Sequence, residues 1–266
     1  MEALGYFAAV VMGISLGLIG GGGSILTVPI LVYFFAQDPL LATTNSLLVV
    51  GACALLGAGL AARRGQIDLA TGALFAAPSF VGVFVARKFI IPALPDPVLS
   101  LSFLTLSKAV LVMTAFATLM VVAATAMIRS KPPTAAAAPK SRQLVIFESV
   151  SKGFLVGMAT GFVGAGGGFL IIPALVLLLG MPMKKAVGTS LAIIAVNSLF
   201  GFTVSQHTDS NWTPLMIITA LGLGGIVVGQ KLTAHVPEVQ LKKGFGVFVL
   251  VVGGAIFMEQ IVKMLS

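Results

Sequence analysis

Two glycine-rich runs are the residues in this sequence best suited to binding chemistry. They consist of Gly20, Gly21, Gly22, Gly23 and Ser24, and of Gly164, Ala165, Gly166, Gly167 and Gly168. Glycine has no Cβ, so its backbone can approach a ligand closely. Free N–H groups at the start of a helical segment, helped by the helix dipole, attract anions. The runs therefore predict turns that bind a small anion, with helix packing through small residues as the competing interpretation.

Hydroxyl and amide side chains form a second candidate set, early in the segment that follows each run. The members are Thr44, Asn45 and Ser46 after the first run, and Thr189, Ser190 and Asn197 after the second. These groups can donate hydrogen bonds to an anion, and they serve equally well in helix capping and interhelical hydrogen bonding. Both interpretations stay open at this level. For the spaced glycines Gly13, Gly17, Gly157 and Gly161, packing is the favoured interpretation.

Acids and histidines are confined to predicted loops, termini and helix ends. This holds for all eight Asp and Glu residues and for both histidines. Hydrolases need a nucleophile with a base or clustered metal ligands, and neither pattern occurs. The sequence thus predicts no enzyme, no catalytic residue, no metal site and no cofactor. Cys53, the single cysteine, is interpreted as a small buried hydrophobe, with a functional thiol as the alternative. Trp212 is interpreted as an interfacial anchor.

The composition indicates a protein whose surroundings are lipid. The chain is 58% hydrophobic and 9% charged, and apolar stretches long enough to span a bilayer recur along it. The net charge of +8 is interpreted as cytoplasmic loops rather than nucleic-acid binding. We expect an all-α integral membrane protein.

The sequence repeats itself at an offset of 144 residues. Of the 45 residues from Gly13 to Gly57, 14 are identical to the residue 144 positions later. The prediction is two homologous units, 1–128 and 144–266, joined by a Pro- and Ala-rich linker at 129–143. Each unit holds a glycine-broken hairpin and three transmembrane helices. The expected hairpins are 4–36 and 152–180, and the expected helices are 40–61, 69–86, 109–128, 186–206, 214–229 and 244–262. The additional segment from Phe89 to Val98 is expected at the interface.

Charge counting favours an inverted arrangement of the two units. As one helix, 4–36 would be about 50 Å long, too long for an ordinary crossing, so a hairpin that returns to its own side is expected. The units are then inverted, and twelve basic residues share one face: Arg63, Arg64, Arg129, Lys131, Lys140, Arg142, Lys152, Lys184, Lys185, Lys231, Lys242 and Lys243. The other face keeps four. If the broken segment instead crossed once, the units would be parallel and these charges would divide almost evenly between the two faces. The positive-inside rule therefore favours the inverted arrangement, with the linker in the cytoplasm and both termini in the periplasm, and two short complete crossings would give the same sidedness.

These features resemble the TauE/SafE family of sulfite-exporter-like permeases. The resemblance rests on the glycine runs with Pro29 and Pro173, and on Val187-Gly-Thr-Ser-Leu191. It implies a transporter of sulfite, thiosulfate, sulfoacetate or a related organosulfonate in the bacterial inner membrane. The first unit departs from Gly-Thr-Ser-Leu by reading Thr44-Asn45-Ser46-Leu47, so its half-site is expected to differ.

The resulting hypothesis is a secondary transporter that exports a small sulfur-containing anion by alternating access. The anion is held near mid-membrane by turn N–H groups and the hydroxyls of Ser24, Thr189 and Ser190. Its partners are the anion and the lipid bilayer; proton or ion coupling and a homodimer are left open. The alternatives are a membrane scaffold or sulfur relay to a cytoplasmic partner, which would use Cys53, and a passive small-molecule channel.

Overall fold

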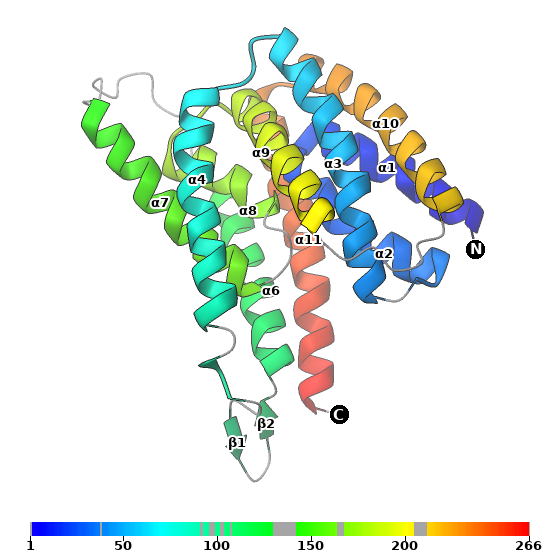
Figure 1. Ribbon diagram of the computed structural model, residues 1–266, viewed down its shortest axis with the longest axis vertical. Helices are drawn as coiled ribbons and strands as arrows, with labels where there is room; N and C mark the ends of the chain where they lie inside the picture. Colours follow the sequence, from blue (N-terminus) through cyan, green and yellow to red (C-terminus); the bar gives the residue numbers. More distant parts are fainter. Residues whose placement is uncertain are drawn as a thin grey trace. The chain divides into compact units, whose positions relative to one another are not determined.

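The computed structural model describes residues 2–37, 39–90, 93–95, 99–101, 104–106, 108–129, 142–163, 168–204 and 212–265, and these are mostly helical (Figure 1). The chain divides into two compact units. Unit 1 comprises residues 1–72 and 181–241, and unit 2 comprises 73–180 and 242–266. Each unit therefore combines elements from both sequence repeats.

A helical hairpin opens unit 1. The elements of this unit are α1 (Glu2–Ile19), the 3₁₀ turn η1 (Gly20–Gly23), α2 (Ser24–Phe35), α3 (Pro39–Arg63), α9 (Met183–Val204) and α10 (Trp212–His235). A methyl group on Gly5 would lie 2.6 Å from the ring of Phe35, and the rings of Tyr6 and Phe35 meet edge to face at 5.1 Å. The end of α2 thus returns to the start of α1, so the glycine break turns the chain back on itself.

Glycines let α1 and α10 pack side by side, backbone against backbone (Figure 1). A methyl group on Gly17 would lie 2.6 Å from the carbonyl oxygen of Ile226, and one on Gly225 would lie 2.5 Å from that of Val10. Residue numbers rise together along the contact, so the two helices are parallel. The packing role predicted for Gly13 and Gly17 is confirmed, since a Cβ on Gly13 would collide with the carbonyl of Gly222.

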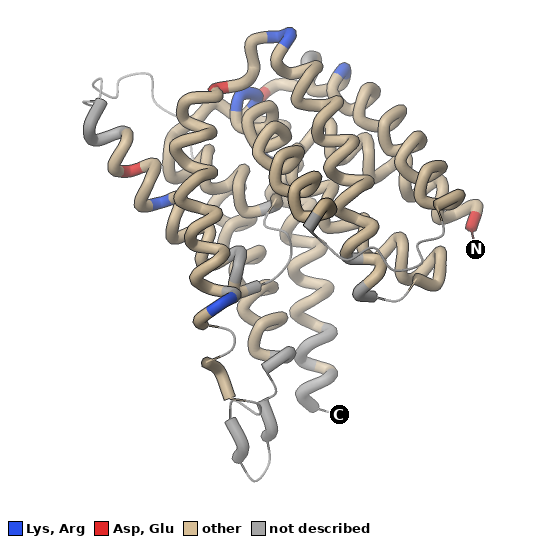
Figure 2. The backbone as a smooth tube through the Cα atoms, viewed as in Figure 1, with Lys and Arg blue, Asp and Glu red and all other residues tan. Residues whose placement is uncertain are grey.

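The basic residues of unit 1 gather at one end of its helices. Helix α3 runs antiparallel to α9, because Gly51 faces Leu199 and Gly188 faces Ala61. It runs parallel to α10, because Cys53 faces Gly222 and, one turn later on both helices, Gly57 faces Ile226. The C-terminal ends of α3 and α10 therefore lie beside the start of α9. This brings together Arg63, Arg64, Lys184, Lys185 and Lys231, at what we call the basic end (Figure 2).

Unit 2 contains the remaining elements. These are most of α4 (Leu69–Val85), the π-helical turn η2 (Ala86–Ile90), strands β1 (Leu99–Leu101) and β2 (Leu104–Leu106), α6 (Lys108–Arg129), α7 (Arg142–Val163), α8 (Gly168–Pro173), the π-helical turn η3 (Ala174–Leu178) and α11 (Glu238–Leu265), which begins in unit 1. The strands pair antiparallel, with Leu99 opposite Leu106. The segments able to cross a membrane are all helical, as predicted, and this small β-hairpin lies outside them.

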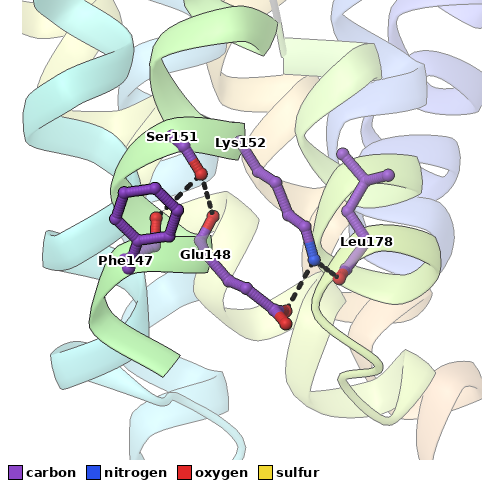
Figure 3. Close-up of polar contacts among 5 residues, drawn as sticks. All are labelled: Phe147, Glu148, Ser151, Lys152 and Leu178. Carbon is purple, nitrogen blue, oxygen red and sulfur yellow. Dashed lines mark hydrogen bonds and ion pairs between the residues drawn. The ribbon is translucent and has the colours of Figure 1, made fainter. Parts of the chain in front are cut away.

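The second hairpin begins earlier than predicted. Helix α7 starts at Arg142, so the prediction of a start at Lys152 is wrong. Lys152 lies inside the helix, where its Nζ contacts a carboxylate oxygen of Glu148 at 2.6 Å, one turn earlier, and donates to the carbonyl of Leu178 at 2.7 Å (Figure 3). Paired with an acid on its own helix, this lysine stabilises α7 instead of ending it. It also ties α7 to the end of η3.

The two hairpins make equivalent contacts with a second helix. A methyl group on Gly225 would meet the carbonyl of Val10 and the amide of Ile14, and one on Gly82 would meet the carbonyl of Phe154 and the amide of Met158. Phe154 and Met158 follow Val10 and Ile14 by the repeat offset of 144. Helix α7 therefore packs on α4 in the register in which α1 packs on α10.

Seven helical segments in the described part of the chain are long and apolar enough to cross a membrane. They are 2–35, 44–63, 69–90, 111–129, 183–203, 212–233 and 238–258. Most bounds agree with prediction within three residues, but α10 continues to His235 instead of ending at 229, and α11 covers 238–265 instead of 244–262. Most of the predicted linker, 130–141, lies outside the described residues.

Candidate functional site

The first glycine run forms an ordered, buried turn. All four glycines of η1 are buried, and Gly20 has a φ of 67°, which favours glycine. A Cβ on Gly23 would lie 2.6 Å from the amide nitrogen of Leu16. The Ser24 hydroxyl donates to the carbonyl of Gly21 at 2.6 Å. Backbone conformation therefore explains why glycine is needed at position 20, and close packing explains it at position 23. The Ser24 hydroxyl already donates its proton within the turn.

Side chains of α10 hold the broken end of α1. The Gly17 carbonyl accepts hydrogen bonds from Gln230 Nε2 at 3.1 Å and from Thr233 Oγ1 at 3.0 Å. Both side chains are only 1% exposed. The backbone carbonyl of Gln230 in turn accepts from Arg64 Nη1 at 2.5 Å. These contacts lie near the basic end of unit 1. The end of α1 before η1 is therefore level with the last turns of α10 and not with its middle, where a site near mid-membrane would lie.

Sequence reasoning missed this cluster. It ended the α10 helix at Gly229, which left Gln230 and Thr233 in a loop. The sequence did contain a signal for them. Gly222, Gly225 and Gly229 lie at helical spacing on the face that meets α1. Gln230 and Thr233 continue that spacing, which indicates that the helix extends past Gly229.

Two of the predicted hydroxyls lie on α9, which packs against η1. Thr189 Oγ1 accepts a hydrogen bond from the backbone N–H of Asp68 at 3.0 Å and is 1% exposed. The Ser190 hydroxyl donates to the carbonyl of Val187 at 2.8 Å. Among the described residues nothing accepts the hydroxyl proton of Thr189, so it can donate to a ligand without breaking a contact. Ser24 and Ser190 would first have to rotate.

The remaining predicted polar residues lie elsewhere in unit 1. Asn45 Nδ2 donates to Gln37 Oε1 at 3.0 Å, which links α3 to the chain just after α2. Ala61 of α3 faces Gly188 of α9 at the basic end. Asn45 precedes Ala61 by sixteen residues on the same helix, so it lies about 24 Å along α3 from the basic end. Thr44 and Ser46 are the neighbours of Asn45 on α3. Asn197 lies between the two ends, level with Gly51 and Cys53, and its Oδ1 is buried without a partner among the described residues.

The second glycine run is described only at its end. Gly168 begins α8 and is buried, whereas Gly164, Gly166 and Gly167 lie outside the described residues. Whether this run forms a turn like η1 stays a prediction.

Cys53 has a packing role. It is 0% exposed, and a methyl group on Gly222 would lie 2.8 Å from its Sγ. The thiol fills the space between α3 and α10 left by that glycine. Trp212 begins α10 and is 51% exposed, as an interfacial anchor would be. No three of the described His, Cys, Asp and Glu residues are grouped so that they could hold a metal ion.

Most buried polar side chains belong to unit 1. Ten of the eleven in the described chain lie there: Ser15, Thr27, Asn45, Ser46, Thr189, Ser190, Ser198, Thr219, Gln230 and Thr233, with Ser149 in unit 2. An uncharged polar interior inside apolar helices suits a small solute passing through a bilayer.

Comparison with known proteins agrees with this reading. The family described as "Sulfite exporter TauE/SafE" matches residues 5–256. The chain belongs to the TauE/SafE family. A probable membrane transporter protein of Xylella fastidiosa strain Temecula1 is 30% identical over 250 residues, covering 91% of this chain and 89% of the relative. One of Haemophilus influenzae is 30% identical over 266 residues, covering 91% and 93%. No solved structure matches.

This TauE/SafE member is therefore a multi-pass membrane transporter and not an enzyme. It acts on a small substrate within a lipid bilayer. The sequence resemblance to the family is confirmed.

Proposed function

We propose that this protein is a secondary transporter that exports a small sulfur-containing anion, such as sulfite, across the bacterial inner membrane. The family description supports the substrate class. The observation that carries the proposal is the buried turn η1 at the break between α1 and α2, which packs against α9 and follows the end of α1 that α10 contacts. Such a break supplies backbone N–H groups to an anion, and a polar cavity in a membrane protein tolerates the unwound backbone.

In this proposal the anion contacts the N–H groups at the start of η1 and the hydroxyl of Thr189. Arg64, bonded to the backbone of Gln230, contributes positive charge beside the turn. Gln230 and Thr233 hold the end of α1 in place. Since all four turn glycines are buried, the substrate can enter only after neighbouring helices move, which fits alternating access.

We also propose the inverted arrangement of the two repeats, with the basic end of unit 1 in the cytoplasm. The equivalent packing of α1 on α10 and of α7 on α4 supports two homologous halves. The grouping of five basic residues at one end of unit 1 supports the sidedness under the positive-inside rule. Two halves that rock about a shared site are a known transporter design.

The test is uptake by proteoliposomes of sulfite, thiosulfate and a sulfonate under ion gradients. Thr189→Val should reduce uptake about tenfold or more, because a hydrogen bond to an anion is lost, whereas Thr189→Ser should retain it. Thr203→Val is the matched control, since Thr203 lies on the same helix and its hydroxyl is exposed and bonded to the carbonyl of Phe200. Failure of the wild-type protein to move any of these anions would refute the proposal.

A further inference from the structure

The side-chain amide of Gln230 has one satisfied end and one unsatisfied end. Its Nε2 donates to the Gly17 carbonyl at 3.1 Å, while its Oε1 is buried and has no hydrogen-bond partner among the described residues. A carbonyl can only accept, so turning the amide over would set two acceptors against each other. The orientation is thereby fixed, and Oε1 is a fixed acceptor.

This acceptor lies at the break in the first hairpin. Oε1 and Nε2 belong to one amide group, so Oε1 lies beside the end of α1, three residues before η1 begins. The Gln230 side chain is 1% exposed. Leaving a buried acceptor without a donor is costly. A donor brought by a ligand would remove that cost.

The surroundings favour a proton donor over a metal cation. Arg64 places its guanidinium against the backbone carbonyl of Gln230, and a positive charge so near opposes a second cation. Carboxylates, the usual partners of a hard cation, form no cluster with other ligands in the described chain. The turn beside Gln230 offers N–H donors suited to an oxyanion. A ligand that satisfies both is an oxyanion that still carries one acidic O–H.

We propose that Gln230 Oε1 accepts a hydrogen bond from the acid proton of the substrate, so that the site selects hydrogensulfite over fully ionised anions. Thiosulfate and organosulfonates carry no such proton near neutral pH. This inference rests on the proposed function and specifies its substrate. Each transported anion then takes one proton with it, and no carboxylate relay in the helices is needed.

Two variants separate this role from a structural one. Gln230→Leu removes both Oε1 and a donor to the Gly17 carbonyl. Thr233→Val leaves Oε1 in place and removes the hydroxyl whose single proton is shared between the carbonyls of Gly17 and Gly229. Initial uptake of sulfite and of methanesulfonate is measured in proteoliposomes at about pH 6 and about pH 8. The ratio of the two rates is used because the amount of folded protein cancels.

For the wild type and for Thr233→Val, the sulfite to methanesulfonate ratio should fall as pH rises and the anion loses its proton. Gln230→Leu should lower the ratio at the acidic pH about tenfold, the loss expected for one buried hydrogen bond, and flatten its pH dependence. Equal ratios and pH profiles in the two variants would overturn the inference and leave transport of sulfite intact. A sodium requirement that only Gln230→Leu weakens would overturn it in favour of a cation site. If the wild type moves neither anion, the proposed function itself fails.

Discussion

Gly224 and Gly225 are adjacent on α10 and offer a paired test of the close contact with α1. A methyl group on Gly225 would lie 2.5 Å from the carbonyl oxygen of Val10 and 2.9 Å from the amide nitrogen of Ile14, whereas one on Gly224 meets nothing within 4 Å. The contacted atoms are backbone, so they cannot rotate away. Gly225→Ala must push the two helices apart, and Gly224→Ala need not.

The magnitude follows from two terms. Replacing glycine by alanine inside a helix gains roughly 0.5–1 kcal/mol of intrinsic propensity, and both variants share that gain. Overpacking in a close contact costs typically 1–3 kcal/mol, and only Gly225→Ala incurs it. The free energy of unfolding should therefore differ by about 1–3 kcal/mol between the variants, with Gly224→Ala the more stable.

The assay is denaturant unfolding of both purified variants in the same detergent, followed by far-UV circular dichroism. Proximity of α1 and α10 is checked independently by crosslinking a cysteine pair at positions 10 and 221 in a Cys53→Ala background. Equal unfolding free energies for the two variants would refute the claim that backbone contact with α1 limits position 225.

Two further predictions concern the thiol and the topology. Cys53→Ser should retain transport, and the native thiol should resist maleimide in the folded protein, because Cys53 is 0% exposed and packed on Gly222; loss of transport with the fold intact would revive the sulfur-relay alternative. In a Cys53→Ala background, single cysteines replacing Asp38 and Pro182 should label from opposite sides of the membrane with an impermeant maleimide. Labelling of both from one side would rule out the inverted arrangement while leaving the substrate assignment standing.

Most of the helices and the first glycine turn could be predicted from local properties of the chain. The break after Ile19 could be predicted because four consecutive glycines end a helix wherever they occur. The start of α7 could not, because Lys152 resembles a loop residue until its contacts with Glu148 and the carbonyl of Leu178 are known. From sequence alone, a charged residue near a helix end can belong either to the helix or to the loop before it. Only its interaction partner in the folded protein shows which.

The composition of the candidate site was only partly predictable. Thr189 and Ser190 were identified by their alignment with the repeat, and they lie on the helix that packs against η1. Gln230 and Thr233 were not, because the hydrogen bonds that reveal them join residues more than two hundred positions apart. Thr44 and Asn45 align with Gly188 and Thr189 in sequence, yet they lie at the opposite end of the unit, because α3 and α9 are antiparallel.

Composition and local pattern were enough to predict a chain that crosses a lipid bilayer, is built from a repeated motif and has its first helix broken by glycine. These are properties of composition and local conformation, which each segment carries with it. The folded structure was needed to show that the hairpin of one repeat packs on the second transmembrane helix of the other, α1 on α10 and α7 on α4. Small residues permit close approach between any two helices. The choice of partner depends on matching whole surfaces, and matching is a property of pairs of segments that neither segment displays alone.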